Sequence, residues 1–226
     1  MKRALITSDL HLGDKIWRHR PINYDSYFSW EVIVQSAIAR KCDAVILAGD
    51  LLDKQTNVSS PIHHLLSGLR KLSEANISVF YNQGQHEYQA MPWISLHDSV
   101  IHLDGNEVYY FGESCQYGLS GRDFGLKDVV SDFLKSEAAA KSDILVMHQV
   151  WLEFMGDICK PQGSFADVPD NVKYVITGDL HKTLNCKPVE GRDLTVLSPG
   201  STHLRSVSED QDKFVFIMNF DDEISV

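Results

Sequence analysis

Residues 44–53 read Ala-Val-Ile-Leu-Ala-Gly-Asp-Leu-Leu-Asp, a short apolar run that ends in a glycine and an acid. A run of this length, bounded by a turn residue, predicts a buried β-strand over Ala44–Ala48. The glycine allows a tight turn just beyond it. Comparable runs predict four further strands, at Ala4–Ser8, Ile77–Asn82, Ile144–His148 and Tyr174–Thr177.

Two longer segments between these runs have the period of a helix. Tyr24–Arg40 and Ile62–Ala75 place apolar residues three and four positions apart, and Asp25 and Pro61 are suitable residues to begin each helix. Strands that alternate with amphipathic helices indicate an α/β fold in which the helices cover a sheet.

The second half of the chain has a different pattern. From Val100 to Gly112, and from Thr183 to the C-terminus, strand-like pieces alternate and are joined by Asp-Gly or Glu-Gly turns. Such turns favour antiparallel neighbours, so we expect more antiparallel pairing here. No repeat or long linker interrupts the sequence, and we therefore expect residues 1–226 to form a single domain.

Composition narrows the function. The 226 residues carry 31 acidic and 21 basic side chains, a formal net charge of −10, which excludes a simple electrostatic nucleic-acid binder. Any phosphate chemistry therefore needs another source of positive charge. The sequence has no apolar run that could span a bilayer, and Asp9 comes too early for a signal peptide, so we expect a cytoplasmic protein. The scattered Cys42, Cys115, Cys159 and Cys186 should be reduced thiols without disulfides.

Each of the five predicted strands ends in side chains that bind metal ions. The blocks are Asp9-Leu10-His11, Gly49-Asp50-Leu51-Leu52-Asp53, Gly84-Gln85-His86-Glu87, His148 and Gly178-Asp179-Leu180-His181. Open α/β sheets bind ligands at the carboxyl ends of their strands. Carboxylate, imidazole and amide donors suit divalent ions such as Mn²⁺, Mg²⁺, Fe²⁺ or Zn²⁺. The sequence therefore predicts a divalent metal site at this edge of the sheet.

The order of these blocks resembles the calcineurin-like metallophosphoesterases, whose pattern reads D-x-H, G-D-x-x-D, G-N-H-D/E, H and G-H-x-H. Within that family, the ending Ser198-Pro199-Gly200-Ser201-Thr202, followed by Arg205 and the strand-like Lys213–Ile217, is most similar to SbcD-type DNA repair exonuclease subunits. The resemblance implies a central β-sandwich of mixed sheets flanked by helices, in four αββα layers. Gln85 stands where the family has asparagine, and Asp179 where it has a histidine.

The resemblance also implies two metal sites that share Asp50. Metal one would be held by Asp9, His11, Asp50 and His181, and metal two by Asp50, Gln85, His148 and Asp179. Two cations roughly 3.5–4 Å apart can generate a bridging hydroxide near neutral pH for in-line attack on phosphorus. We expect Mn²⁺ first, with Mg²⁺, Fe²⁺ and Zn²⁺ as alternatives. Both substituted positions still offer oxygen ligands, and a decayed second site is the competing interpretation.

Further roles follow from the same resemblance. His86 would face the scissile phosphate as a catalytic group that protonates the leaving oxygen or stabilises its charge. Asp53 and Glu87 would be carboxylates that orient imidazoles or backbone turns near it. Independently of the resemblance, Arg18 lies in a basic and aromatic segment that follows the first metal block, so it would contact substrate or belong to a plain surface loop. His203 and Arg205 follow the Pro-Gly-Ser turn and would reach a phosphate from the opposite side.

The leading hypothesis is thus a binuclear metal-dependent phosphodiesterase that acts on DNA as a nuclease. A small-substrate phosphatase or nucleotide phosphodiesterase is the alternative, and an inactive scaffold with the same fold is the third. Larger SbcD-type relatives carry a DNA-capping domain and helices that engage an SbcC-type ABC ATPase. We expect this chain to stop before both and to depend on a partner subunit for grip on DNA. Homodimerisation stays open, and we expect no membrane partner.

Overall fold

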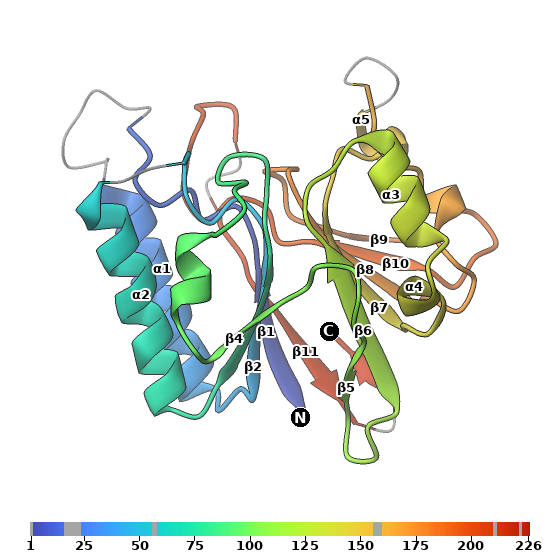
Figure 1. The fold of residues 1–226 in the computed structure, drawn as a ribbon, viewed down its shortest axis with the longest axis horizontal. Helices are drawn as coiled ribbons and strands as arrows, with labels where there is room; N and C mark the ends of the chain where they lie inside the picture. Colours follow the sequence, from blue (N-terminus) through green and yellow to red (C-terminus); the bar gives the residue numbers. More distant parts are fainter. Residues whose placement is uncertain (1, 16–23, 56–57, 156–159, 210–211, 222) are drawn as a thin grey trace.

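Two β-sheets pack face to face at the centre of the molecule, and helices cover their outer faces (Figure 1). The structure is a computed structural model that describes residues 2–15, 24–55, 58–155, 160–209, 212–221 and 223–226. Within these residues each sheet has six strands, in the orders β12-β11-β1-β2-β3-β4 and β5-β6-β7-β8-β10-β9. The predicted fold class, two mixed sheets flanked by helices, is therefore confirmed.

The first sheet contains strands from both ends of the chain, namely β1 (Arg3–Thr7), β2 (Ala44–Ala48), β3 (Ser78–Asn82), β4 (Val100–His102), β11 (Phe216–Phe220) and β12 (Ile224–Ser225). The second sheet is built from β5 (Tyr109–Phe111), β6 (Tyr117–Arg122), β7 (Ile144–His148), β8 (Tyr174–Gly178), β9 (Leu184–Cys186) and β10 (Thr195–Ser198). The helices are α1 (Asp25–Ala39), α2 (Ser59–Glu74), α3 (Lys127–Leu134), α4 (Glu137–Ala140) and α5 (Leu152–Met155), with short 3₁₀ turns η2 (Trp93–Leu96) and η4 (Phe165–Asp167).

The strands β1, β2 and β3 of the first sheet are buried on both faces, and their side chains alternate between two cores. Leu5 and Val45 belong to the core shared with α1 and α2, whereas Ile6 and Ile46 belong to the core between the two sheets. A third core lies on the outer face of the second sheet, around Trp151. This arrangement explains why the strands are continuous apolar runs in the sequence.

The five predicted strands and both predicted helices are present, and their ends differ from the prediction by three residues at most. The strand over Ala44–Ala48 has the predicted bounds, and α1 is one residue shorter than predicted at each end. The helix α2 begins three residues before Ile62 because Pro61 is tolerated within a first helical turn. None of the helices in the described parts of the chain is long and apolar enough to cross a membrane.

The predicted antiparallel pairing is confirmed for β5, β9, β11 and β12. It does not extend to the centre of the second sheet, where β6, β7, β8 and β10 run parallel. Parallel neighbours need a crossover, which α3 and α4 supply between β6 and β7. Val100–Gly112 is not a hairpin either, because β4 extends the first sheet and β5 begins the second.

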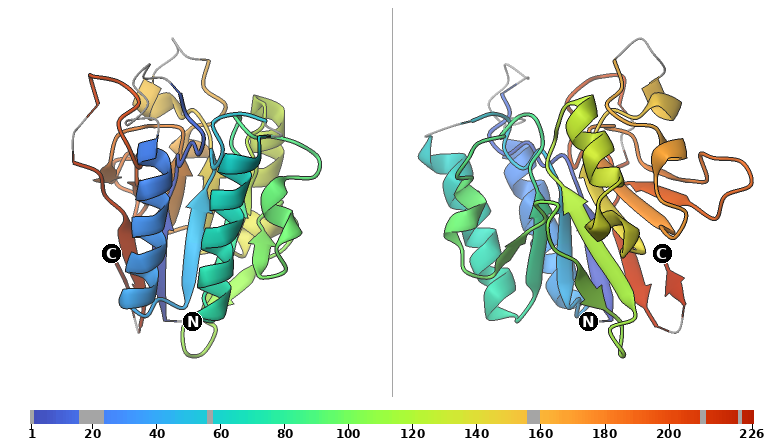
Figure 2. Two further views of the ribbon diagram at one scale, coloured as in Figure 1. Left: turned by 90° about the vertical axis from the view of Figure 1, so that its left-hand side faces the viewer. Right: turned by 45° about the vertical axis from the view of Figure 1, so that its right-hand side comes forward.

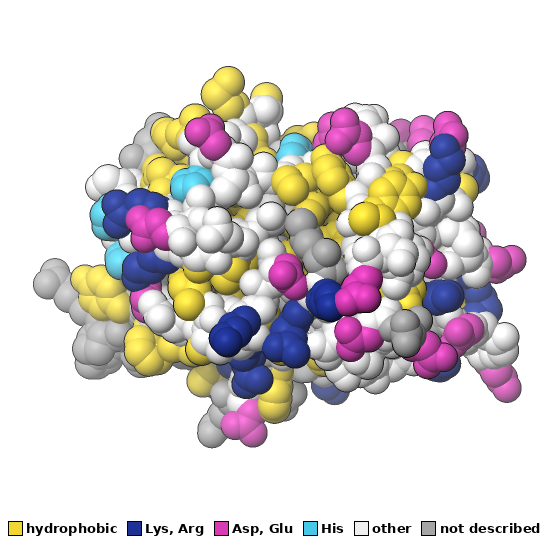
Figure 3. All heavy atoms as spheres, turned by 90° about the horizontal axis from the view of Figure 1, so that it is seen from below, with side chains coloured by type: hydrophobic (Ala, Val, Ile, Leu, Met, Phe, Trp, Pro, Cys, Tyr) yellow, Lys and Arg dark blue, Asp and Glu magenta, His cyan; other side chains and the backbone are white. Residues whose placement is uncertain are grey.

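The carboxyl ends of β1, β2, β3, β7 and β8 lie at the same end of the molecule, away from the N-terminus (Figures 1 and 2). Loops from both sheets therefore meet there. The opposite end, viewed in Figure 3, carries lysine and arginine side chains that lie close to acidic ones. The two ends of the fold thus differ in their side chains. The predicted ligand blocks lie at one end, and basic and acidic side chains are mixed at the other.

Gly68 controls how closely α2 approaches α1. A methyl group there would lie 2.2 Å from Nε1 of Trp30, a buried side chain that donates a hydrogen bond to the His64 carbonyl. We expect Gly68→Ala to lower the free energy of unfolding by about 1–2 kcal/mol, since overpacking outweighs the gain in helix propensity. Urea denaturation measures this, with exposed Arg70→Ala as the control; a stabilised Gly68→Ala protein would contradict the close approach.

Candidate metal centre

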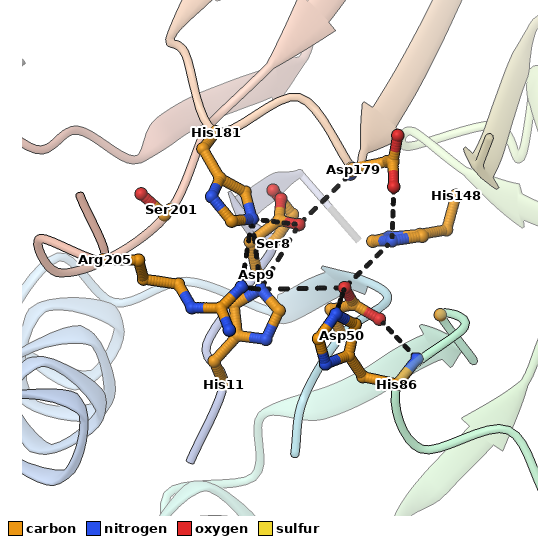
Figure 4. A network of polar contacts seen from close by, with 12 residues as sticks. Ser8, Asp9, His11, Asp50, His86, His148, Asp179, His181, Ser201 and Arg205 are labelled. Carbon is orange, nitrogen blue, oxygen red and sulfur yellow. Dashed lines mark hydrogen bonds and ion pairs between the residues drawn. The ribbon is translucent and has the colours of Figure 1, made fainter. Parts of the chain in front are cut away.

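Acidic and histidine side chains from both sheets converge on one point where the strands end (Figure 4). The first sheet contributes Asp9 and His11 after β1, Asp50 after β2 and His86 after β3. The second sheet contributes His148, the last residue of β7, and then Asp179 and His181 after β8. The centre therefore spans the junction between the sheets.

Asp50 lies in the middle of this group. Its Oδ2 atom is 3.4 Å from Nε2 of His148, 3.6 Å from Nε2 of His11 and 3.8 Å from Nε2 of His86. Its other oxygen accepts a hydrogen bond of 3.1 Å from the backbone N–H of His86. One buried carboxylate thus faces imidazoles from three different strands, which is the position a bridging ligand would need.

Asp9 forms a second group with two of the histidines. Its Oδ1 atom lies 3.9 Å from Nε2 of His11 and 3.8 Å from Nε2 of His181, and these two nitrogens are 3.2 Å apart. The same oxygen accepts a hydrogen bond of 3.1 Å from the backbone N–H of Asp179. The distances place three donor atoms around one small volume, as binding of a single cation requires.

The backbone at this centre is strained. Four residues here have a positive φ, in the left-handed region that residues other than glycine rarely adopt. They are Asp9, His11, Asp50 and Asp179, with φ values of 51°, 42°, 51° and 72°. Each such residue costs on the order of 1–3 kcal/mol and persists only where the surrounding structure imposes it. Four at one site indicate that the turns are shaped to aim side chains rather than to maximise stability.

Two glycines keep space open around the carboxylates and imidazoles. A methyl group on Gly84 would lie 2.0 Å from Oδ1 of Asp50, and one on Gly178 would lie 2.3 Å from Nδ1 of His148. Neither position tolerates a side chain unless the site itself moves. The glycines of the sequence blocks are therefore needed for close packing of the backbone against the candidate ligands.

Burial makes the electrostatics of the centre unfavourable without added positive charge. It raises the pKa of Asp9 and lowers that of His11 well below its usual range, since both charged forms lose hydration. Burial acts on His148 in the same direction as on His11, but the Asp50 carboxylate outweighs it and raises the pKa of His148. The neighbouring buried carboxylates of Asp9 and Asp50 therefore favour a positive charge at the centre.

The residues present fit a divalent metal centre. Among the described residues, Oδ2 of Asp9 is a buried oxygen with no hydrogen-bond partner, which is costly for a carboxylate unless a cation compensates it. The donor set combines carboxylates with imidazoles, the ligands that Mn²⁺, Fe²⁺ and Zn²⁺ share in proteins. The distances between the donor atoms and the unpaired Oδ2 of Asp9 therefore both indicate a site for a divalent cation.

Two of the histidines are held by hydrogen bonds on the side away from the centre. Nδ1 of His148 lies 2.7 Å from the carbonyl oxygen of Ala48, and Nδ1 of His181 lies 3.0 Å from Oε1 of Glu209. Each Nδ1–H can donate to its oxygen, which fixes the ring and turns Nε2 towards the centre. These contacts prepare both rings to act as ligands.

The two substituted positions lie together at the edge of the centre. The side-chain amide of Gln85 donates a hydrogen bond to Oδ1 of Asp179, and that oxygen is 4.0 Å from Nε2 of His148. Gln85 and Asp179, which come from different sheets, are therefore neighbours. Their mutual contact is what the chain has in place of an asparagine and a histidine.

His86 lies next to Asp50 and is held in place by Asp53 and Glu87. Nδ1 of His86 is hydrogen bonded to the carbonyl oxygen of Asp53, so its Nε2 is directed towards the centre. Glu87 lies beneath the turn, where Oε1 accepts a 2.8 Å hydrogen bond from the N–H of Gly84, and burial raises its pKa to about 8. Asp53 thus positions His86 through its backbone, and Glu87 supports the turn that carries it.

Arg205 reaches into the centre from the loop after β10. Its Nη1 atom is 2.9 Å from Nε2 of His11, Nη2 donates to Oδ1 of Asp53 at 2.8 Å, and Nε donates to Oδ2 of Asp14 at 2.9 Å. His203 lies behind it, with Nε2 3.3 Å from the same oxygen of Asp14. Arg205 therefore touches the candidate ligands, whereas His203 contacts the acid that anchors Arg205.

Asp14 and Glu209 are parts of the site that sequence reasoning missed. Besides His181, Glu209 accepts hydrogen bonds from the side chains of Ser201 and Lys213. Burial alone would raise the pKa of Glu209, but the hydrogen bonds from Lys213, from the backbone of Arg205 and from Ser201 together outweigh it and lower this pKa to about 2. Neither acid follows a predicted strand, so no pattern in the sequence marks it.

Two predictions fall outside the described residues. Arg18 belongs to residues 16–23 and Cys159 to residues 156–159, and the structure describes neither range. The other three cysteines, Cys42, Cys115 and Cys186, are free thiols.

Comparison with known proteins agrees with this geometry. The sequence model of the calcineurin-like phosphoesterase family matches residues 2–183. The chain belongs to this family. That membership confirms the resemblance found in the sequence blocks, and it covers the segment that carries every candidate ligand from Asp9 to His181.

Curated relatives of this calcineurin-like phosphoesterase include archaeal repair proteins. The chain is 27% identical to the DNA double-strand break repair protein Mre11 of Methanosarcina acetivorans, over 98% of this chain and 37% of that protein. It is 28% identical to the Mre11 protein of Methanosarcina mazei, over 98% of this chain and 36% of that protein. The chain thus spans little more than a third of the length of these two relatives.

Solved structures share the fold at lower sequence identity. The protein TT1561 of Thermus thermophilus aligns with a TM-score of 0.59 and 16% identity over 89% of this chain and 90% of that chain. A dimetal phosphatase from Danio rerio aligns with a TM-score of 0.61 and 10% identity over 98% of this chain and 93% of that chain. These likenesses concern the fold of the family and not the activity of this member.

The contact between Glu209 and His181 predicts an effect on metal affinity. Glu209→Gln removes the charge that holds His181 Nδ1–H, and losing such an outer contact weakens metal binding by about 10- to 100-fold. Calorimetric titration of the apo protein with Mn²⁺ measures this, with exposed Glu74→Gln as the matched control. Unchanged Mn²⁺ affinity in Glu209→Gln would contradict the positioning role.

Proposed function

We propose that this family member is a metal-dependent phosphodiesterase that cleaves DNA, a nuclease of the SbcD or Mre11 type. The observation that carries the proposal is the convergence of buried carboxylates and imidazoles around Asp50, with an oxygen of Asp9 that has no hydrogen-bond partner among the described residues. The names of the archaeal relatives add support for DNA as the substrate class.

In this proposal the ligand sets are those that the family resemblance implies, and the first of them contains the group of three residues around Asp9. Asp9, His11, Asp50 and His181 would hold one divalent ion, and Asp50, Gln85, His148 and Asp179 would hold the other. When bound, two such ions activate water as a nucleophile and neutralise the charge that builds up on the phosphate. The finer assignment of Mn²⁺ as the ion is also proposed, on the chemistry of the added carboxylate Asp179.

Side chains of the protein supply the remaining steps. His86, turned towards Asp50 by the carbonyl of Asp53, would give a proton to the leaving oxygen. Arg205, fixed by Asp14 and Asp53, would contact a non-bridging phosphate oxygen through its guanidinium. The strained turns would hold these groups in position before substrate arrives, so that little reorganisation is needed during reaction.

Grip on a long duplex needs more positive charge than this chain displays. Its net charge is −10, and the end opposite the centre carries basic side chains beside acidic ones (Figure 3). We therefore propose that an SbcC-type ABC ATPase subunit, or a second copy of the chain, supplies further DNA contacts.

An intracellular substrate such as DNA also fits the expected cytoplasmic location. We further propose that residues 1–226 act as one domain, because β11 lies beside β1.

Asp50 is the residue on which this function depends most directly. We expect Asp50→Asn to reduce Mn²⁺-dependent cleavage of single- and double-stranded DNA to background, because the shared carboxylate charge is lost. Gel assays of labelled DNA measure this, with exposed Asp98→Asn as the matched control. Wild-type protein that cleaves neither form of DNA with Mn²⁺ would overturn the nuclease proposal.

A small phosphate ester is the second candidate substrate, and the acidic net charge is the observation that favours it. Turnover of p-nitrophenyl phosphate is compared with that of bis(p-nitrophenyl) phosphate. Strong hydrolysis of the monoester without DNA cleavage supports the phosphatase, and the reverse supports the nuclease. A purified protein that retains less than one ion per chain after incubation with Mn²⁺ would instead support the scaffold hypothesis.

The proposed role of His86 separates catalysis from metal binding. We expect His86→Gln to lower kcat by roughly 10²- to 10⁴-fold, the usual contribution of a general acid, with Mn²⁺ affinity nearly unchanged. Steady-state kinetics on bis(p-nitrophenyl) phosphate and Mn²⁺ titration measure the two quantities, with exposed His63→Gln as the control. A parallel loss of metal affinity would make His86 a ligand instead.

A further inference from the structure

A cavity of about 570 Å³ opens beside the metal centre and shares Gln85 with it. Gln85 donates to Asp179 on its metal side, and the cavity extends from Gln85 towards the loops that follow β4 and β6. The N–H of Phe124 donates to the carbonyl of Gln83 at 2.8 Å, which fixes the loop after β6 against the loop after β3. The volume lies in the range of small-molecule sites in proteins.

The cavity presents apolar and aromatic surface to solvent. Tyr88, Phe124 and Leu126 line it, and Tyr88 and Leu126 are 50% and 70% exposed. Exposed apolar side chains gathered in a hollow next to a reaction centre favour contact with a ligand over plain solvation. A tyrosine ring in such a place offers a face on which a flat group can stack.

The polar lining consists largely of amides. Gln55, Gln85 and Asn106 carry both donors and acceptors, the combination that reads the edge of a nucleobase. Each amide nitrogen already donates one hydrogen bond within the protein, and its second N–H and the carbonyl oxygen can contact a ligand. Arg122 also lines the cavity, but its guanidinium donates to the Asp104 carbonyl, and the carboxylates Asp104 and Asp123 leave the lining with a net negative charge that would repel a second phosphate. The lining therefore suits a neutral planar group rich in donors and acceptors, rather than another anion.

We propose that this cavity binds the nucleobase of the nucleotide that adjoins the phosphate at the metal centre. The inference rests on the proposed phosphodiesterase function and adds a nucleoside site to it. Tyr88 stacks on the base, and the amides contact its edge. A second cavity, of about 900 Å³, shares Leu126 and is lined by Lys127, Asp128 and Lys160, whose net positive charge suits the next phosphate along a single strand.

The test compares two phosphodiesters with the same leaving group, thymidine 5′-(p-nitrophenyl phosphate) and methyl p-nitrophenyl phosphate. Loss of one stacked base costs a factor of about 5 to 150, so Tyr88→Ala should lower kcat/KM for the thymidine ester by that much more than for the methyl ester. Tyr88→Phe keeps the ring and should restore the preference. Tyr110→Ala, which removes an equally exposed tyrosine on β5, should leave both esters unaffected.

A binding measurement keeps this inference separable from the proposed function. Calorimetric titration of thymidine needs no turnover, and Tyr88→Ala should weaken it by a similar factor. Wild type that hydrolyses neither ester yet binds thymidine through Tyr88 would overturn the phosphodiesterase and keep the nucleoside site. Equal effects of Tyr88→Ala on both esters, or thymidine binding that ignores Tyr88, would overturn the nucleoside site.

Discussion

The structure depends on two carboxylates, Asp9 and Asp50, that are buried together where the sheets meet. Buried like charges repel one another and lose hydration, and both penalties grow as the surroundings become less polar. The fold accepts them because imidazoles from three strands surround Asp50 and because positive charge can be added between the sheets. Binding of a cation and stability of the junction are therefore coupled.

This constraint explains why so much of the surrounding structure favours function over stability. Left-handed backbone at four ligand positions, glycines packed against side chains, and an arginine held by two acids each restrict what evolution can substitute there. The cores, in contrast, are continuous and apolar on both faces of the first sheet. A well-packed core thus supports a strained backbone at the candidate metal centre, which is the usual arrangement of an enzyme site.

The parts that were predictable from sequence are those in which one residue's neighbours along the chain decide the outcome. Strands such as Ala44–Ala48 are short apolar runs, and the ligand blocks follow them directly. The direction of β6 was not predictable, because it depends on the crossover through α3 rather than on its own residues. Glu209 and Asp14 were missed for a similar reason: their partners lie 28 and 191 residues away, and only folding reveals those contacts.

The pairing of β11 with β1 affects how the molecule is made. The strand that leads into Asp9 and His11 lies between β2 and β11, so one of its edges stays without a partner until residues 216–220 have left the ribosome. Contacts between such distant segments form slowly, and an unpaired edge is exposed to aggregation during that interval. The first ligands to be synthesised are thus among the last to be secured.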